Sequence, residues 1–251
     1  MIFAVFHRDK KRVFWGKRGT KSKFDHRFGG SVQYAGLRAF PRRLPVHLLI
    51  RLNTADACVG VRLSTAQWLP LLCAIRYGAC ELGYRVLSDN KVKILHQGET
   101  KVWRGFPSKE YPTALPAKPM DLREGIYDPG DPQNALMFGG VFGYDALTRR
   151  QFANLVKYVE QEDLPDMVGC ESAEEYLEGN GWPFLQGPPE DGCPDPTCRL
   201  HDVTGGLRTF ALFQEEDRGA SKLWGPNGEN LQIVYQICPD CSAILTTHQC
   251  T

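Results

Sequence analysis

Cysteines near the C-terminus have a spacing typical of metal-binding turns. Cys238 and Cys241 are separated by Pro-Asp, and a turn of this length can direct two thiolates at one tetrahedral ion. A second pair, Cys193 and Cys198, lies upstream in Cys-Pro-Asp-Pro-Thr-Cys, where proline again favours a turn. Two such pairs predict one Zn²⁺ ion held by four thiolates. A site of this kind is structural, because no coordination position is left for a reacting water molecule.

Other interpretations of these cysteines stay open. A redox Cys-x-x-Cys pair normally begins a helix next to a βαβ unit, whereas Cys238 follows a strand-like run. The four thiols could also be unrelated buried side chains, since free cysteine is among the most buried residue types. If the cysteines do bind zinc, another residue could replace one of them, and the candidates are His201, His248, Cys250 and Cys170.

The rest of the sequence carries no recognisable catalytic motif. It contains no Gly-x-Ser-x-Gly nucleophile elbow, no Walker phosphate loop and no dinucleotide-binding glycine fingerprint. An enzyme whose site is not visible in one sequence is therefore the third hypothesis, after the two binding functions described below.

The composition is that of an ordinary folded protein, with 42% apolar and 24% charged residues. No stretch approaches the roughly 20 apolar residues of a membrane span. The N-terminal apolar run is interrupted at His7–Lys10 and does not resemble a secretory signal. Nine cysteines without such a signal argue against a disulfide framework. We therefore expect a cytoplasmic protein with reduced thiols and no membrane partner.

Charge is distributed unevenly along the chain, although the net charge is only +1. Residues Met1–Arg51 contain thirteen Lys or Arg and two Asp, a local balance of +11. Residues Glu160–Thr251 contain four Lys or Arg and seventeen Asp or Glu, a balance of −13. The two ends could pack near each other and neutralise. Alternatively, the basic third, which also contains interleaved aromatic residues, could bind nucleic acid or another anion.

Strands are predicted where short apolar or alternating runs are bounded by turn residues. The predicted strands are Met1–Phe6 with Arg12–Trp15 as a hairpin, Tyr84–Leu87 with Lys91–His96 as a second hairpin, Leu44–Leu52, Thr209–Phe213 and Leu231–Ile237. The run Gln232–Ile237 leads into Cys238, and Ser242–Leu245 leaves Cys241. This arrangement resembles one hairpin of a zinc ribbon.

Helices are predicted from N-capping residues followed by apolar residues at helical spacing. A helix is expected over Ser64–Cys80, where Leu71, Leu72, Ile75 and Cys80 recur at that spacing. Thr148 and Gln151 have the capping-box form, and an apolar stripe follows over Phe152–Val159. A shorter helix is expected over Ser172–Gly179.

A proline-rich segment lies near the middle of the chain, with six prolines between Phe106 and Pro132. This density predicts a long irregular connection. The chain is then either one compact domain over residues 1–251 or two halves, 1–106 and 133–251, joined by residues 107–132. Because strands and helices do not alternate regularly, we predict an α+β fold with a large mixed or antiparallel β component, a few helices and a zinc-ribbon-like C-terminal hairpin.

Three segments of the C-terminal third, in this order, resemble the YwqG-like family: Gly181–Gln186 (GWPFLQ), Phe210–Asp217 (FALFQEED) and Leu223–Gln232 (LWGPNGENLQ). The match departs from the family pattern at Asn180-Gly181, where the family has two glycines, and at Pro226, where it has Asp. The cysteine pairs are additions to the pattern. The resemblance implies an α+β fold, no known catalytic residues, and a role in binding partner proteins, sometimes as an immunity-type protein.

Together these observations favour a non-catalytic binding protein with a structural zinc site at Cys193, Cys198, Cys238 and Cys241. Binding of nucleic acid or another anion by the basic N-terminal third is the alternative.

Overall fold

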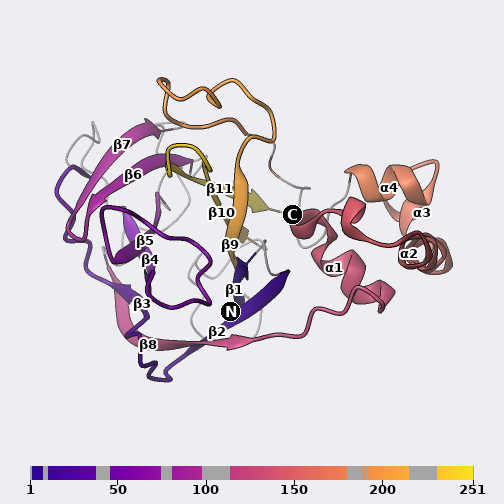
Figure 1. Ribbon diagram of the computed structural model, residues 1–251, viewed down its shortest axis with the longest axis horizontal. Helices are drawn as coiled ribbons and strands as arrows, with labels where there is room; N and C mark the ends of the chain where they lie inside the picture. The colour runs from indigo at the N-terminus through magenta and orange to yellow at the C-terminus, as the bar shows by residue number, and fades with distance from the viewer. Residues whose placement is uncertain are drawn as a thin grey trace.

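The computed structural model describes residues 2–7, 11–37, 46–74, 81–97, 114–179, 189, 191–214 and 231–250. It consists mostly of strands, with a few short helices (Figure 1). The strands are β1 (Ile2–His7), β2 (Arg12–Arg18), β3 (Arg27–Gly30), β4 (His47–Asn53), β5 (Trp68–Cys73), β6 (Leu82–Ser88), β7 (Lys91–Gln97), β8 (Leu115–Glu124), β9 (Arg208–Gln214), β10 (Leu231–Ile237) and β11 (Ile244–Cys250). The helices are α1 (Pro132–Phe142), α2 (Arg149–Gln161), α3 (Leu164–Val168) and α4 (Ala173–Gly179), with a 3₁₀ turn, η3 (Tyr144–Ala146). None of the described helices has the length and apolar character needed to cross a membrane.

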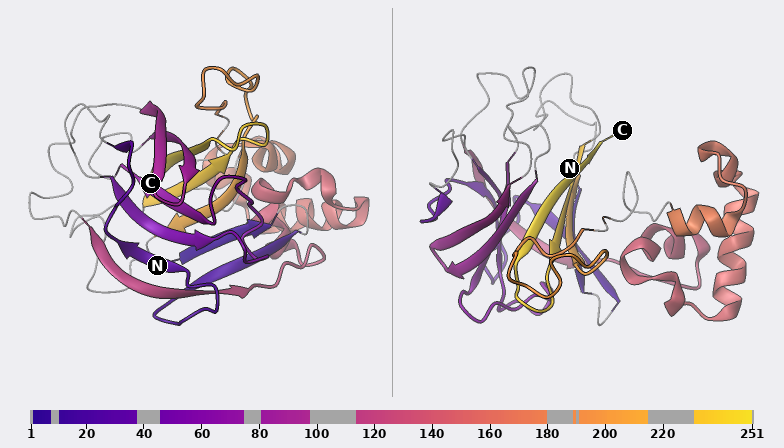
Figure 2. Two further views of the ribbon diagram at one scale, coloured as in Figure 1. Left: turned by 60° about the vertical axis from the view of Figure 1, so that its left-hand side comes forward. Right: turned by 90° about the horizontal axis from the view of Figure 1, so that it is seen from above.

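All eleven described strands belong to one sheet, in the order β5-β4-β3-β8-β2-β1-β9-β10-β11-β6-β7, and every pair of neighbours is antiparallel. The sheet is strongly curled (Figure 2). Its edge strand β5 returns to lie against β6, where the buried Tyr84 hydroxyl donates to the Pro70 carbonyl (2.7 Å) and accepts from the Leu72 N–H (3.2 Å). Thr246 on β11 adds a hydrogen bond to the Leu72 carbonyl. The α+β prediction with a large antiparallel component is therefore confirmed in outline.

The main core fills the inside of the curl, and alternation along the strands explains how it forms. On β1, Phe3 and Val5 point into this core, while Ala4 and Phe6 point to the opposite face and pack against α1. Helices α1, α2 and α4 share a further small core, and they stand on one side of the sheet (Figure 2).

Both predicted hairpins and two of the three predicted helices are present. β1 pairs with β2, and β6 pairs with β7. Helix α2 begins with the predicted capping box, in which Thr148 and Gln151 satisfy each other's backbone N–H groups. Helix α4 covers the shorter helix expected after Ser172.

The helix predicted over Ser64–Cys80 is wrong, because its central residues form strand β5 instead. Leu69, Leu71 and Leu72 are fully buried, so the apolar run has the pattern of a strand buried on both faces. Pro70 lacks an N–H group, which an edge strand tolerates. Residues 75–80 lie outside the described part of the chain.

The prediction of an irregular connection over residues 107–132 is also wrong for its central part, because Leu115–Glu124 form strand β8. Strand β8 lies in the middle of the sheet, pairing with β3 through its first half and with β2 from Met120 onward. Pro116 and Pro119 lie in the half of β8 that pairs only with β3. A missing N–H group is tolerated there, because the other side of the strand has no ladder partner. Strands from residues 1–106 and 133–251 are neighbours in this sheet, as in the pairs β1–β9 and β11–β6. Residues 107–113 lie outside the described part.

Candidate metal centre

The first pair of cysteines is held in a loop before β9 that is shaped by Asp195. The Asp195 carboxylate accepts hydrogen bonds from the Thr197 N–H (2.9 Å) and hydroxyl (2.8 Å). The Asp195 carbonyl accepts from the Cys198 N–H, which closes the turn. These bonds are local, so the Cys-Pro-Asp-Pro-Thr-Cys sequence itself favours the turn that brings Cys193 and Cys198 together.

The second pair lies in the turn that joins β10 to β11. The last pair of the hairpin ladder is Ile237 with Ile244. Beyond it, the Cys238 N–H donates to the Ala243 carbonyl, and the Ser242 N–H donates to the Cys238 carbonyl. The predicted strand–turn–strand arrangement around Cys238 and Cys241 is therefore present.

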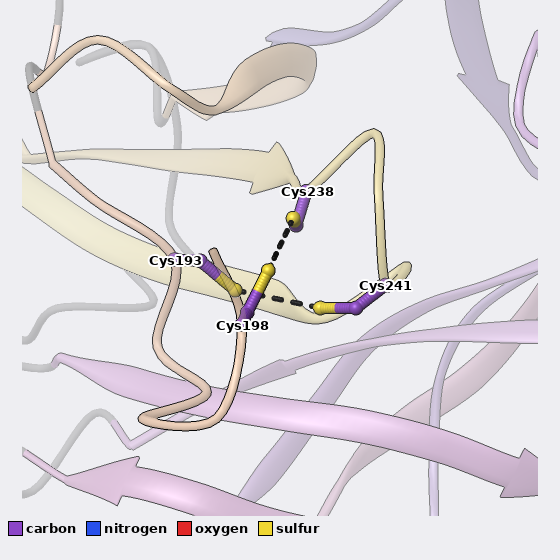
Figure 3. A group of neighbouring side chains, drawn as sticks. All are labelled: Cys193, Cys198, Cys238 and Cys241. Atoms are coloured by element: carbon purple, nitrogen blue, oxygen red, sulfur yellow. Dashed lines mark hydrogen bonds between the residues drawn. The ribbon is translucent and has the colours of Figure 1, made fainter. Parts of the chain in front are cut away.

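The two turns bring all four sulfurs together (Figure 3). The Sγ atoms of Cys193 and Cys241 are 3.4 Å apart, and those of Cys198 and Cys238 are 3.7 Å apart. All four atoms lie within 4.8 Å of one another. Disulfide sulfurs are about 2.05 Å apart, so neither of these contacts is a disulfide, and all four cysteines are free.

The sulfur geometry fits a tetrahedral metal ion. Four sulfurs bound at about 2.3 Å from one ion lie about 3.8 Å from each other, close to the 3.4 and 3.7 Å found for two of the sulfur pairs. Burial favours the same assignment, because Cys193 and Cys238 are each 1% exposed and the other two cysteines are half-buried. The four cysteines can thus hold a metal ion together. A redox pair at a helix start is not favoured, since Cys238 and Cys241 lie in the turn between two strands.

The thiols of Cys193, Cys238 and Cys241 differ in the direction of their pKa shifts. Burial raises the pKa of Cys193 and Cys238. Burial also opposes ionisation of Cys241, but the Ala243 N–H and hydrogen bonds from Cys193 and Arg85 hold the pKa of Cys241 below its ordinary value. Of these three thiols, Cys241 is therefore the one most ready to lose its proton when a metal ion binds.

Arg85 on β6 links the cluster to the sheet. Its guanidinium donates to the Asp195 carboxylate at 2.5 Å and also hydrogen-bonds Cys241. Four thiolates around a divalent ion carry a net charge of −2, and an adjacent guanidinium offsets part of it. The loop can approach β6 because residue 83 is glycine: a Cβ there would overlap the Pro194 side chain. Nothing in the cysteine spacing pointed to Arg85 or Gly83.

A second ion pair joins the two turns directly. Arg199 follows Cys198, and its guanidinium binds the carboxylate of Asp240, which lies between Cys238 and Cys241. This pair is largely exposed on the arginine side, so it aligns the turns more than it stabilises them.

Among the side chains that the structure describes, the alternative ligands do not join the sulfur cluster. His201 uses Nδ1 to donate to the Cys193 carbonyl (2.6 Å), so it supports the loop. His248 lies four residues along β11 from Ile244, about 13 Å away at strand spacing. Cys250 is farther along the same strand, and Cys170 packs against the helical core.

A buried His26–Asp56 pair is a feature that the sequence did not reveal. His26 is fully buried, and its Nε2 lies 2.8 Å from the Asp56 carboxylate. Its Nδ1 accepts from the Asn53 N–H, so Nε2 carries the proton that is donated to Asp56. With both ring nitrogens engaged in this way, the pair holds the loop after β4 in place.

Comparisons with protein-family models, with curated proteins and with solved structures gave no match to this chain. The resemblance to YwqG-like proteins stays a prediction, and two of its three segments fall mainly outside the described residues.

Proposed function

We propose that this chain is a non-catalytic binding protein whose fold is stabilised by one structural zinc ion. The observation that carries the proposal is the cluster of four sulfurs from Cys193, Cys198, Cys238 and Cys241. Zn²⁺ favours four thiolates in a tetrahedral arrangement, and it contributes binding free energy to folding when bound in this way.

A structural role follows from the ligand set. Four protein thiolates would fill the coordination sphere, so no substrate or water could bind the ion. The site also connects segments that are remote in sequence, namely the loop before β9, the β10–β11 turn and strand β6. Binding an ion there would fix this end of the curled sheet.

The proposal includes a cytoplasmic location and a protein partner. Thiolate ligands must stay reduced, and a reducing compartment keeps them so. The resemblance to YwqG-like proteins supports a partner protein, including an immunity-type partner. Both statements rest on the sequence.

Metal analysis of purified protein tests the zinc site. We expect about one zinc per chain, because one four-ligand site is proposed. The double variant Cys238→Ser/Cys241→Ser should lose the metal, whereas Cys170→Ser, a cysteine of the helical core, should keep it. Well-folded wild-type protein that contains no metal after exposure to zinc, with all thiols freely titratable, would overturn the proposal.

A further inference from the structure

One corner of the sheet carries a concentration of exposed cations, which we call the basic corner. Its residues come from the end of β2, the β2–β3 connection, the start of β3 and the first half of β8: Lys17, Arg18, Lys21, Lys23, Arg27 and Lys118, all exposed. Strand β8 lies between β3 and β2, and Arg27 pairs with Pro119 while Arg18 pairs with Met120. The backbone positions of these cations are therefore neighbours, although Arg18 and Lys118 leave the sheet on the core side while Lys17 and Arg27 leave it on the outer face.

The positive charge of the basic corner is only partly neutralised. Asp25 binds Arg27 through both carboxylate oxygens and also reaches Arg51. Asp121 lies 3.6 Å from Arg123. Among the described residues, the four lysines of the corner and Arg18 form no ion pair. Six cations against these two carboxylates leave a clear excess of positive charge.

The acidic C-terminal third does not neutralise this excess within the described part of the chain. The ion pairs found there for Arg12, Arg27 and Arg51 are with Glu124 or Asp25, and none involves a residue beyond 160. The acidic residues from Glu160 to Glu178 lie on and between helices α2 to α4, across the molecule from β3 and the start of β8 (Figure 1). Of the two sequence hypotheses, a surface that attracts an anion is the one this arrangement favours.

Partly exposed aromatic rings lie beside these cations. Lys23 Nζ lies 4.8 Å from the ring centre of Phe24, and the Arg51 guanidinium lies 4.2 Å from that of Trp68. The two rings are neighbours, because the Phe24 carbonyl accepts a hydrogen bond from the Asn53 side chain (3.1 Å), and Asn53 pairs with Trp68 across β4 and β5. Both rings are half-buried, so each is held by the fold while part of it stays accessible.

We infer that the basic corner and its aromatic neighbours bind single-stranded nucleic acid. Cations that follow a phosphate backbone, combined with aromatic side chains on which bases stack, are the features that such proteins share. A duplex offers phosphates but no free base faces, so the aromatic residues favour a single strand. This function goes beyond the proposed zinc-stabilised fold and does not require the metal.

Fluorescence anisotropy with a labelled oligothymidylate tests the inference on the full-length protein. With about four phosphates contacted, the slope of log affinity against log salt should be about −3, or roughly a 50-fold loss between 50 and 200 mM salt. Lys21→Glu/Lys23→Glu should weaken binding at least about tenfold, because it reverses two charges at the phosphate contacts. The matched control Arg150→Glu/Lys157→Glu, on exposed positions of α2, should change affinity less than about twofold.

The aromatic contribution has a separate readout. Trp68→Leu should weaken single-strand binding by about fivefold or more while leaving affinity for a duplex of the same length unchanged. Absence of binding at low salt would overturn the inference, as would equal losses in the two double variants. A duplex affinity equal to that for the single strand, or binding to anionic vesicles without binding to the oligonucleotide, would also overturn it. Zinc content of the same preparations reports on the metal proposal independently.

Discussion

The proposed zinc site predicts a specific dependence of thermal stability on free zinc concentration. The structure has one four-sulfur cluster among its described residues, so one ion should bind per folded chain. An ion that binds only the folded state stabilises it by RT ln(1 + [Zn²⁺]/Kd). Above the dissociation constant, each tenfold rise in free zinc should therefore add about 1.4 kcal/mol. For a chain of 251 residues this corresponds to about 3–6 °C in Tm per tenfold step.

Thermal unfolding in metal-buffered solutions, followed by circular dichroism, measures this slope. Removing zinc with a chelator should loosen the loop at residues 191–206 and the β10–β11 turn, which the sulfurs hold together. The main core inside the curl uses other residues, so most of the sheet signal should remain at low temperature. Hydrogen exchange should accordingly increase in the loop and turn before it increases in β1 or β9.

Two results would refute this reasoning. One is a wild-type Tm that does not change with free zinc over several tenfold steps. The other is an equal slope in Cys238→Ser/Cys241→Ser, since binding would then occur elsewhere. The variant Cys170→Ser should keep the wild-type slope.

Three further predictions concern residues around the curl. Gly83→Ala places a methyl group against Pro194 and should lower the free energy of unfolding in urea by about 1–3 kcal/mol. It should also weaken zinc affinity, and an unchanged affinity would show that the position of this loop on β6 does not affect the metal site. Tyr84→Phe removes the hydroxyl that bonds the Pro70 carbonyl and the Leu72 N–H, and it should lower the free energy of unfolding by about 1–3 kcal/mol. An unchanged free energy of unfolding would show that β5 does not need these hydrogen bonds to β6. Although burial opposes ionisation of Asp56, hydrogen bonds from the Cys58 N–H and His26 lower its pKa, so its contribution to stability is present above about pH 4 and is lost as pH falls through the folded-state value. Asp56→Asn should therefore lose less stability than wild type on acidification, and an identical acid dependence would contradict the assignment.

Local sequence was sufficient for elements whose stabilising contacts are also local. The capping box at Thr148, the β6–β7 hairpin and the turn between β10 and β11 each form through residues within a few positions of one another. The spacing of the cysteines belongs to this class, because the Asp195 side chain shapes its turn through hydrogen bonds to the next few residues.

Tertiary structure decided the elements whose environment is built from distant segments. The run around Leu71 has apolar residues that suit a helix or a buried strand, and pairing with β4 selected the strand. Prolines around 116 and 119 indicated an irregular segment, yet β8 tolerates them because that half of the strand has a ladder partner on one side only.

For the site, the sequence by itself determined two turns, each able to direct two thiolates at an ion. Only the tertiary structure decided that these turns meet, with Cys198 and Cys238 forty positions apart, and that Arg85 and Gly83 on β6 receive the loop. The physical reason is the distance along the chain between the residues that interact. A turn is fixed by hydrogen bonds between neighbours in the chain, whereas the meeting of two turns, and the charge and space around their sulfurs, depend on how the sheet curls.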